Sequence, residues 1–134
     1  MKAKQNAPMG EPTKSELEIL QVLWKSGPST VRFVNDELNR SMRKVIYMST
    51  LKLMQIMVEK GFLKKDESQF KHVYMAAVEE GKTKSVMLNR VIDTMFGGSA
   101  SSLLMQLMGN QKLSSKEMEE YQALIKKMDE NSKS

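Results

Sequence analysis

A strip of polar side chains crosses an otherwise apolar segment between residues 45 and 62. Met48, Lys52, Gln55 and Glu59 are spaced four, three and four residues apart, so they fall on one face of a helix. The other positions are mostly Leu, Ile, Met and Val, which favours burial of the remaining faces. A helix that packs on most sides and exposes one polar strip has the form of a base-reading helix in a DNA groove.

The side chains of this strip and its first turn offer several kinds of DNA contact. Gln55 can form two hydrogen bonds with adenine, and Lys52 can reach guanine or a phosphate. Met48 offers an apolar surface to a thymine methyl group. Ser49 and Thr50 lie near the helix N-terminus, where hydroxyl and amide groups can donate to phosphate. The alternative is that the strip is only a solvated helix face.

Basic residues flank the strip on both sides. We expect Arg43 and Lys44, which precede the helix, to contact phosphates and set the register of the protein on DNA. Further basic side chains in a predicted β-hairpin could lie over the adjacent backbone or minor groove, namely Lys64, Lys65, Lys71 and His72. The alternative for the hairpin is that these charges are solvated and contact nothing.

The excess of positive over negative charge lies in the N-terminal part of the chain. The net charge is +5, and residues 1–78 contain 13 Lys and Arg against 8 Asp and Glu. Residues 79–134 contain eight of each sign. A basic half beside a neutral half indicates a nucleic-acid-binding module joined to a second domain.

The composition argues against an enzyme, a metal site or a membrane protein. The chain has no cysteine, and its single histidine, His72, lacks the partners that a catalytic triad or a zinc site requires. We therefore expect no catalysis, no cofactor and no bound metal. No apolar run approaches the roughly 18 residues of a membrane span, and the N-terminus lacks the apolar region of a signal peptide. We expect a cytoplasmic protein.

The elements around the strip follow an order that identifies the fold class. A capping-box pattern at Thr13–Glu16 opens a first helix, and Gly27-Pro28 ends it. The next predicted elements are a helix over residues 31–39, a helix ending near residue 60, and strands over residues 62–65 and 70–75. This order predicts a winged helix-turn-helix domain over residues 13–78, preceded by a flexible tail over residues 1–12.

The C-terminal part, residues 79–134, shows helical periodicity with apolar stripes. So few residues cannot bury these stripes by themselves, and a second copy of the chain would cover them. The predicted fold is therefore mostly α with a small β-hairpin, a winged helix-turn-helix followed by a helical dimerisation domain. A two-fold dimer also suits an operator with two half-sites.

Three longer segments carry a family resemblance. They are Pro12-Thr-Lys-Ser-Glu-Leu-Glu-Ile-Leu-Gln-Val-Leu-Trp24, Glu59-Lys-Gly-Phe62 and Leu113-Ser-Ser-Lys-Glu-Met-Glu-Glu120. Together they resemble the penicillinase repressor family, which includes the regulators of β-lactamase and methicillin-resistance genes. The resemblance implies a homodimeric winged-helix repressor that occupies a palindromic operator and dimerises through its C-terminal helices.

The resemblance also implies a route to derepression. Family members are commonly cleaved when a membrane sensor peptidase detects β-lactam, and in well-known members the cut falls between Asn and Phe in a C-terminal helix. Counting back from Leu113-Ser114 places Gln106 and Leu107 at that position, so cleavage here would require a peptidase of altered specificity. The copper-responsive branch of the family carries a C-terminal cysteine motif, which this chain lacks.

Two functional hypotheses follow from the sequence. The first is a sequence-specific transcriptional repressor that binds a palindromic operator as a homodimer and is relieved by proteolysis of the C-terminal domain. The second is a winged-helix protein–protein interaction module without sequence-specific DNA binding, in which the polar strip docks a partner protein.

Overall fold

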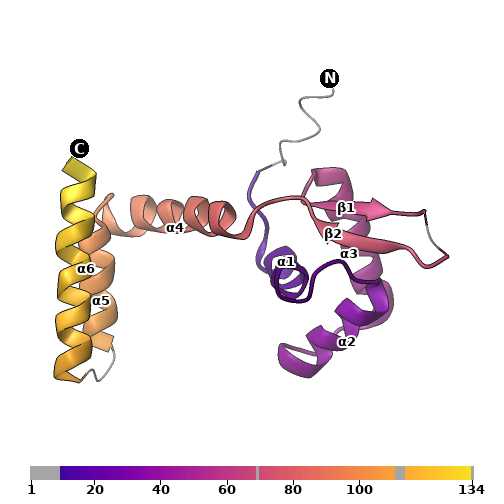
Figure 1. Ribbon diagram of the computed structural model, residues 1–134, viewed down its shortest axis with the longest axis horizontal. Coiled ribbons are helices and arrows are strands. Elements are labelled where there is room, and N and C mark those ends of the chain that lie inside the picture. Colours follow the sequence, from indigo (N-terminus) through magenta and orange to yellow (C-terminus); the bar gives the residue numbers. More distant parts are fainter. Residues whose placement is uncertain (1–9, 69, 111–113, 134) are drawn as a thin grey trace. The chain divides into compact units, whose positions relative to one another are not determined.

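A computed structural model describes residues 10–68, 70–110 and 114–133. Its elements, in chain order, are α1 (Lys14–Ser26), α2 (Val31–Ser41), α3 (Tyr47–Lys60), β1 (Leu63–Asp66), β2 (Val73–Ala76), α4 (Glu80–Phe96), α5 (Ala100–Asn110) and α6 (Ser115–Lys133) (Figure 1). This order confirms the predicted fold class, a winged helix-turn-helix followed by helices. Residues 1–9 of the predicted tail lie outside the described residues.

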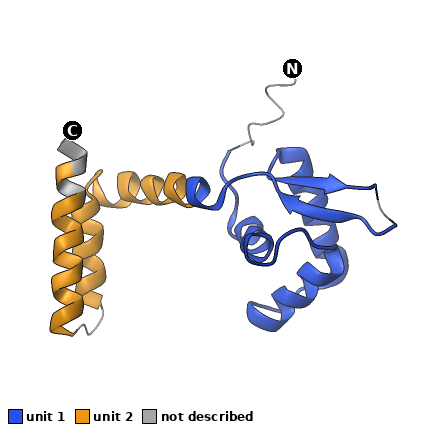
Figure 2. Ribbon diagram, viewed as in Figure 1, with its two compact units in different colours: residues 1–83 blue, residues 84–134 orange. Residues whose placement is uncertain are grey.

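The chain divides into two compact units (Figure 2). The N-terminal unit ends at Thr83 and holds the three helices and the hairpin of the winged helix. The C-terminal unit begins at Lys84 and holds most of α4 together with α5 and α6.

The N-terminal unit has one hydrophobic core, to which all three helices and both strands contribute. The core side chains that are at most 3% exposed are Ile19, Leu20 and Leu23 of α1, Val34 and Leu38 of α2, Met54 and Met57 of α3, and Phe62, Leu63 and Tyr74. Burial of such side chains contributes about 1.5–3 kcal/mol each. The unbranched methionines of α3 can adapt to the space left between the other elements.

The ends of α1 and α3 follow from local chemistry. The Thr13 hydroxyl accepts from Glu16 N at 3.2 Å while Thr13 N donates to the Glu16 carboxylate at 2.9 Å, which confirms the predicted capping box. Helix α3 begins at Tyr47 because Ile46 has extended backbone angles. It ends at Gly61, whose φ of 92° lies in the left-handed region that glycine adopts without strain.

The hairpin differs in detail from the prediction. Strands β1 and β2 pair antiparallel with Leu63 opposite Ala76, so both strands lie further along the chain than predicted. Strand β1 ends at Asp66, because its carboxylate accepts hydrogen bonds from the Ser68 amide at 2.9 Å and from the Ser68 hydroxyl at 2.6 Å, which turns the chain. Gln69, between the two strands, lies outside the described residues.

The turn between α1 and α2 adds a third short segment to this sheet. Ser29 N donates to Tyr74 O at 2.9 Å, and Tyr74 N donates to Ser29 O at 2.8 Å. The indole nitrogen of Trp24 donates to the carbonyl of Val78 at 3.0 Å. The α1–α2 connection is therefore hydrogen-bonded to β2, and α1 to the segment that follows β2.

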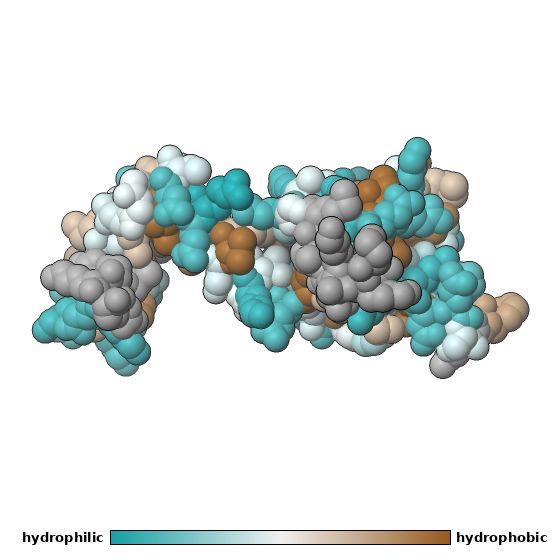
Figure 3. Space-filling view, turned by 90° about the horizontal axis from the view of Figure 1, so that it is seen from above, coloured by the Kyte–Doolittle hydropathy of each residue, from teal (hydrophilic) through white to brown (hydrophobic). Residues whose placement is uncertain are grey.

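The C-terminal unit buries almost none of its described apolar residues. Ile92 is the single buried residue among those of this unit whose burial is described. Hydrophobic residues are visible at the surface over α4 (Figure 3), where the exposed ones are Val86, Leu88, Val91 and Met95. Gly97 and Gly98, both with positive φ, separate α4 from α5. Across the described part of the chain, no helix is long and apolar enough to cross a membrane.

Candidate nucleic-acid interface

The polar strip lies on the exposed face of α3. The exposed side chains of this helix are Met48, Ser49, Lys52, Gln55 and Glu59. Met54 and Met57, both 0% exposed, lie on the opposite face and anchor the helix in the core. The spacing of apolar and polar residues therefore produces a helix with one solvent-exposed face, and that face carries the polar strip.

Thr50 is the exception. Its side chain is 1% exposed, and its hydroxyl accepts a hydrogen bond from the Asn35 side-chain amide at 2.8 Å. The expectation that the Thr50 side chain faces a phosphate is therefore wrong. The residue was assigned by its position in the first helical turn, but it falls on the side of that turn that packs against α2.

Two asparagines of α2 hold the segment that leads into α3. The Nδ2 groups of Asn35 and Asn39 both donate to the carbonyl of Val45 at 3.0 Å. The Asn39 carbonyl Oδ1 accepts in return from Val45 N at 2.9 Å. These bonds satisfy the exposed loop backbone and fix where α3 begins relative to α2.

A partly buried ion pair fixes the other end of α3. Lys60 Nζ lies 2.7 Å from the Glu16 carboxylate, whose side chain is 2% exposed. The same carboxylate caps α1, so one acidic group joins the start of α1 to the last turn of α3. The sequence identified Glu16 as a capping residue but gave no sign of this second contact.

The basic residues before α3 are partly engaged within the protein. Arg43 donates to the Glu18 carboxylate at 3.0 Å and to the Ser15 hydroxyl at 3.1 Å, which directs its side chain toward α1. Arg40 pairs with Glu37 at 2.6 Å, and their hydrogen bond raises the pKa of Arg40 and lowers that of Glu37. Lys44 is exposed.

The hairpin presents basic side chains along β1 and in its loop. Lys64 lies exposed on β1, and Lys71 and His72 lie exposed in the loop before β2. Lys65 Nζ lies 3.1 Å from the Glu67 carboxylate and 5.8 Å from the centre of the Tyr74 ring. The hydrogen bond to Glu67 is the largest of the effects that raise the pKa of Lys65, so this side chain remains charged at neutral pH.

Hydrogen bonds in the hairpin turn stabilise the charged form of the Asp66 carboxylate. The Ser68 hydroxyl, followed by the Ser68 amide, lowers the pKa of Asp66. The carboxylate therefore keeps its role as the acceptor that closes the turn at neutral pH.

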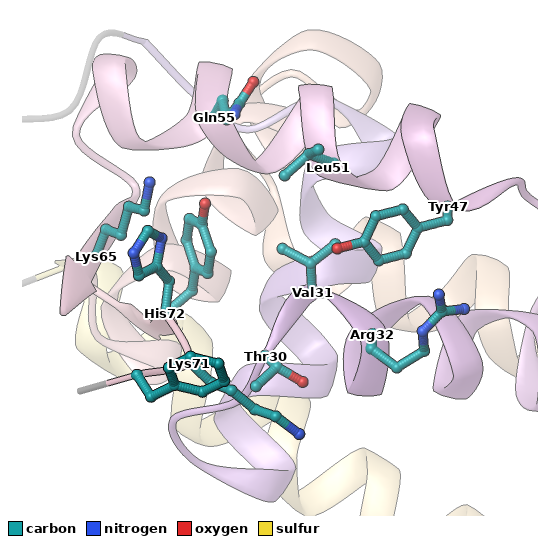
Figure 4. Close-up of a pocket in the computed structure, with 11 residues that line it drawn as sticks. Thr30, Val31, Arg32, Tyr47, Leu51, Gln55, Lys65, Lys71 and His72 are labelled. Atoms are coloured by element: carbon teal, nitrogen blue, oxygen red, sulfur yellow. The ribbon is translucent and has the colours of Figure 1, made fainter. Parts of the chain in front are cut away.

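An open groove of about 650 Å³ lies between the hairpin, α3 and the start of α2 (Figure 4). Gln55 and Leu51 border it from α3, and Lys65, Lys71 and His72 border it from the hairpin. The groove therefore places Gln55 of the polar strip on the same face of the N-terminal unit as the basic side chains of the hairpin.

The same groove contains a residue that the sequence analysis missed. The guanidinium of Arg32 lies 4.5 Å from the centre of the Tyr47 ring, which holds an exposed cation beside the first turn of α3. Arg32 also lies in the first turn of α2, whose N-cap Thr30 accepts from Phe33 N at 3.1 Å. The sequence gives little indication of this position, because the placement of the Arg32 guanidinium depends on Tyr47, which lies in another helix.

The predicted cleavage residues lie within α5. Gln106 is exposed, and Leu107 is 41% exposed. Among the described residues, no group of three or more His, Asp or Glu side chains is placed to hold a metal ion.

Comparison with known proteins agrees with this arrangement. The sequence matches the family profile described as penicillinase repressor over residues 12–127, which covers the whole winged helix and most of the C-terminal unit. A comparison with curated proteins gives no match. This chain therefore belongs to the penicillinase repressor family, whose members are DNA-binding transcriptional repressors.

Proposed function

We propose that this repressor binds a palindromic operator as a homodimer and thereby blocks transcription in the cytoplasm. The observation that carries the proposal is the exposed strip of α3, which lies beside a cationic groove while the rest of the helix is packed. In this arrangement Lys52 and Gln55 read base edges in the major groove, Met48 contacts a thymine methyl group, and Ser49 donates to a phosphate.

Basic side chains around the strip would supply the sequence-independent part of the affinity. The exposed candidates are Arg32, Lys44, Lys64, Lys71 and His72. Lys65 is half-buried but borders the groove, and Arg43 would contact DNA only by leaving Glu18 and Ser15. About 6–10 phosphate contacts would make the affinity fall by roughly 10³–10⁵ between 50 and 200 mM salt.

The C-terminal unit supports the homodimer part of the proposal. A unit in which Ile92 is the one buried residue among those described has little core of its own. A second copy would cover the exposed apolar residues of α4, α5 and α6, such as Val91, Leu107 and Leu124. Two linked winged helices then bind two half-sites with a high effective local concentration.

Derepression is proposed to occur by cleavage between Gln106 and Leu107. The bond lies in α5, which contacts α6, so a cut would divide the surface that holds the two copies together. Loss of that surface removes the linkage between half-sites and releases the operator. A membrane sensor peptidase whose specificity differs from the Asn-Phe cut would be required.

A selection experiment tests the DNA-binding proposal. The full chain is incubated with random-sequence DNA duplexes, and the bound fraction is amplified and sequenced at several salt concentrations. The expected result is an inverted repeat whose half-sites are about one or two helical turns apart. Binding without any sequence preference would instead favour the protein–protein interaction module.

A further inference from the structure

Helix α3 carries methionines in two opposite environments. Met48 is 63% exposed at the head of the polar strip, whereas Met54 and Met57 are each 0% exposed in the core. The sulfur of an exposed methionine can be oxidised to the sulfoxide, and reductases can reverse the reaction. The same helix therefore contains one accessible thioether and two protected ones.

We propose that Met48 is an oxidation site whose conversion to methionine sulfoxide weakens operator binding. This inference rests on the proposed function, because its effect is exerted through the base-reading strip. The chain has no cysteine, so thioethers take the place of thiols as its readily oxidised sulfur groups.

The reaction is a two-electron oxygen transfer from a peroxide. A sulfur lone pair of Met48 attacks one oxygen of hydrogen peroxide, the O–O bond breaks, and an S–O bond forms. The departing hydroxide takes up the proton of the transferred oxygen, so the products are the sulfoxide and water. Sulfur is oxidised by two electrons and the peroxide is reduced by two.

The product would alter the strip in two ways. The sulfoxide is polar, so the apolar contact with a thymine methyl group is lost. Its oxygen is also a hydrogen-bond acceptor located one helical turn from Lys52, since residues four apart are neighbours on a helix surface. A bond between them would withdraw the Lys52 ammonium from the DNA.

The positions of the other exposed methionines make Met48 the site of interest. Met95, Met105 and Met118 belong to the C-terminal unit, where the proposed dimer would shield them. Met42 is 46% exposed in the loop after α2 and lies outside the strip. Met42 is therefore the natural internal control within the N-terminal unit.

The test treats the full-length protein with graded hydrogen peroxide. Peptide mass spectrometry measures the sulfoxide fraction at each methionine, and fluorescence anisotropy measures affinity for a duplex that the untreated protein has selected. We expect Met48 to be oxidised well ahead of Met54 and Met57, and the selected duplex to protect it. Affinity should fall about tenfold or more, in proportion to the sulfoxide fraction at Met48 and not at Met42. The two epimer-specific methionine sulfoxide reductases should restore it.

Two variants separate Met48 from the other methionines. Each is compared with its own untreated sample: Met48→Leu should lose no further affinity on treatment, whereas Met42→Leu should respond like the wild type. Three results would refute this inference and leave the proposed function standing. They are oxidation of Met48 with unchanged affinity, equal losses of affinity in Met48→Leu and the wild type, and oxidation of Met48 no faster than that of Met54 and Met57. An untreated protein that selects no DNA sequence would refute the proposed function, and this inference with it.

Discussion

The side-chain amide of Asn35 donates a 2.8 Å hydrogen bond to the hydroxyl of Thr50, and so joins the second helix to the third inside the core. The same amide also donates to the carbonyl of Val45. Asn35 and Thr50 are 4% and 1% exposed, so water does not compete for these groups. The direction in which α3 presents its exposed strip is therefore set by a polar contact on its hidden side.

Replacement of Asn35 by Ala should lower the free energy of unfolding. The change leaves the buried Thr50 hydroxyl without this donor and removes one donor from the Val45 carbonyl, for a loss of about 1–3 kcal/mol. Thr50→Val removes only the acceptor and keeps the shape, so about 0.5–1.5 kcal/mol is expected. Urea denaturation measures both values, with the exposed Asp36→Ala on the same helix as the control. A Thr50→Val loss as large as that of Asn35→Ala would contradict the assignment.

Features that depend on local spacing were predictable from the sequence. The exposed strip of α3 and the capping box of α1 both follow from residues three or four apart, and helix geometry alone brings such residues together. The strands were less accurately placed: β1 extends one residue beyond its predicted end, to the turn that the Asp66 carboxylate forms with Ser68, and β2 begins at Val73 instead of residue 70.

Features that depend on contacts between distant residues were not predictable. Asn35 and Thr50 are 15 residues apart, and Glu16 and Lys60 are 44 apart. The burial of Thr50 itself follows from helical spacing, since it precedes Met54 and Met57 by four and seven residues, but nothing in either local segment indicates the partner. Arg32 was overlooked for the same reason, since its placement depends on Tyr47.

Replacing Lys60 and replacing Glu16 should lower the free energy of unfolding by different amounts. Lys60→Met leaves the Glu16 carboxylate buried without a cation. It should lower the free energy of unfolding by about 3 kcal/mol, the low end of the range for a broken buried ion pair. Glu16→Gln should cost about 1 kcal/mol, because an amide can still accept from Thr13 N while the partly exposed Lys60 turns to water. The double variant should be more stable than Lys60→Met alone. Urea denaturation of all four proteins gives the coupling, and an additive result would show that the charges do not interact.

Lys52 and Gln55 should differ in what they contribute to recognition. Gln55→Ala removes a two-bond contact with one base, so it should relax specificity at one position of each half-site and cost about 1–3 kcal/mol on the best duplex. Lys52→Ala should weaken binding to the best duplex and also reduce its salt dependence if the ammonium reaches a phosphate. Repeating the duplex selection with each variant measures this, and Glu59→Ala serves as the control on the same exposed face. Unchanged sequence preference in the Lys52→Ala, Gln55→Ala double variant would exclude the strip as the reader.

Arg32 should act as a phosphate contact that carries no sequence information. Arg32→Gln should weaken binding to all duplexes by a similar factor, and the slope of log affinity against log salt should fall by about 1 per monomer. Tyr47→Phe keeps the ring that supports the guanidinium, so its salt slope should equal that of the wild type. A loss confined to one base pair would instead make Arg32 a base-reading residue.

Removal of the chain from Ser99 onward should separate DNA binding from dimerisation. The truncated protein keeps the complete core of the N-terminal unit, whose residues extend no further than Val78, so circular dichroism should still report a folded winged helix. It lacks α5 and α6, which carry exposed apolar residues such as Met105 and Leu124, so sedimentation should find mainly monomer. Affinity for a full operator should then approach that for a single half-site, because the linkage that raised the effective concentration is gone. A stable dimer after this truncation would place the interface in α4 or in the winged helix itself.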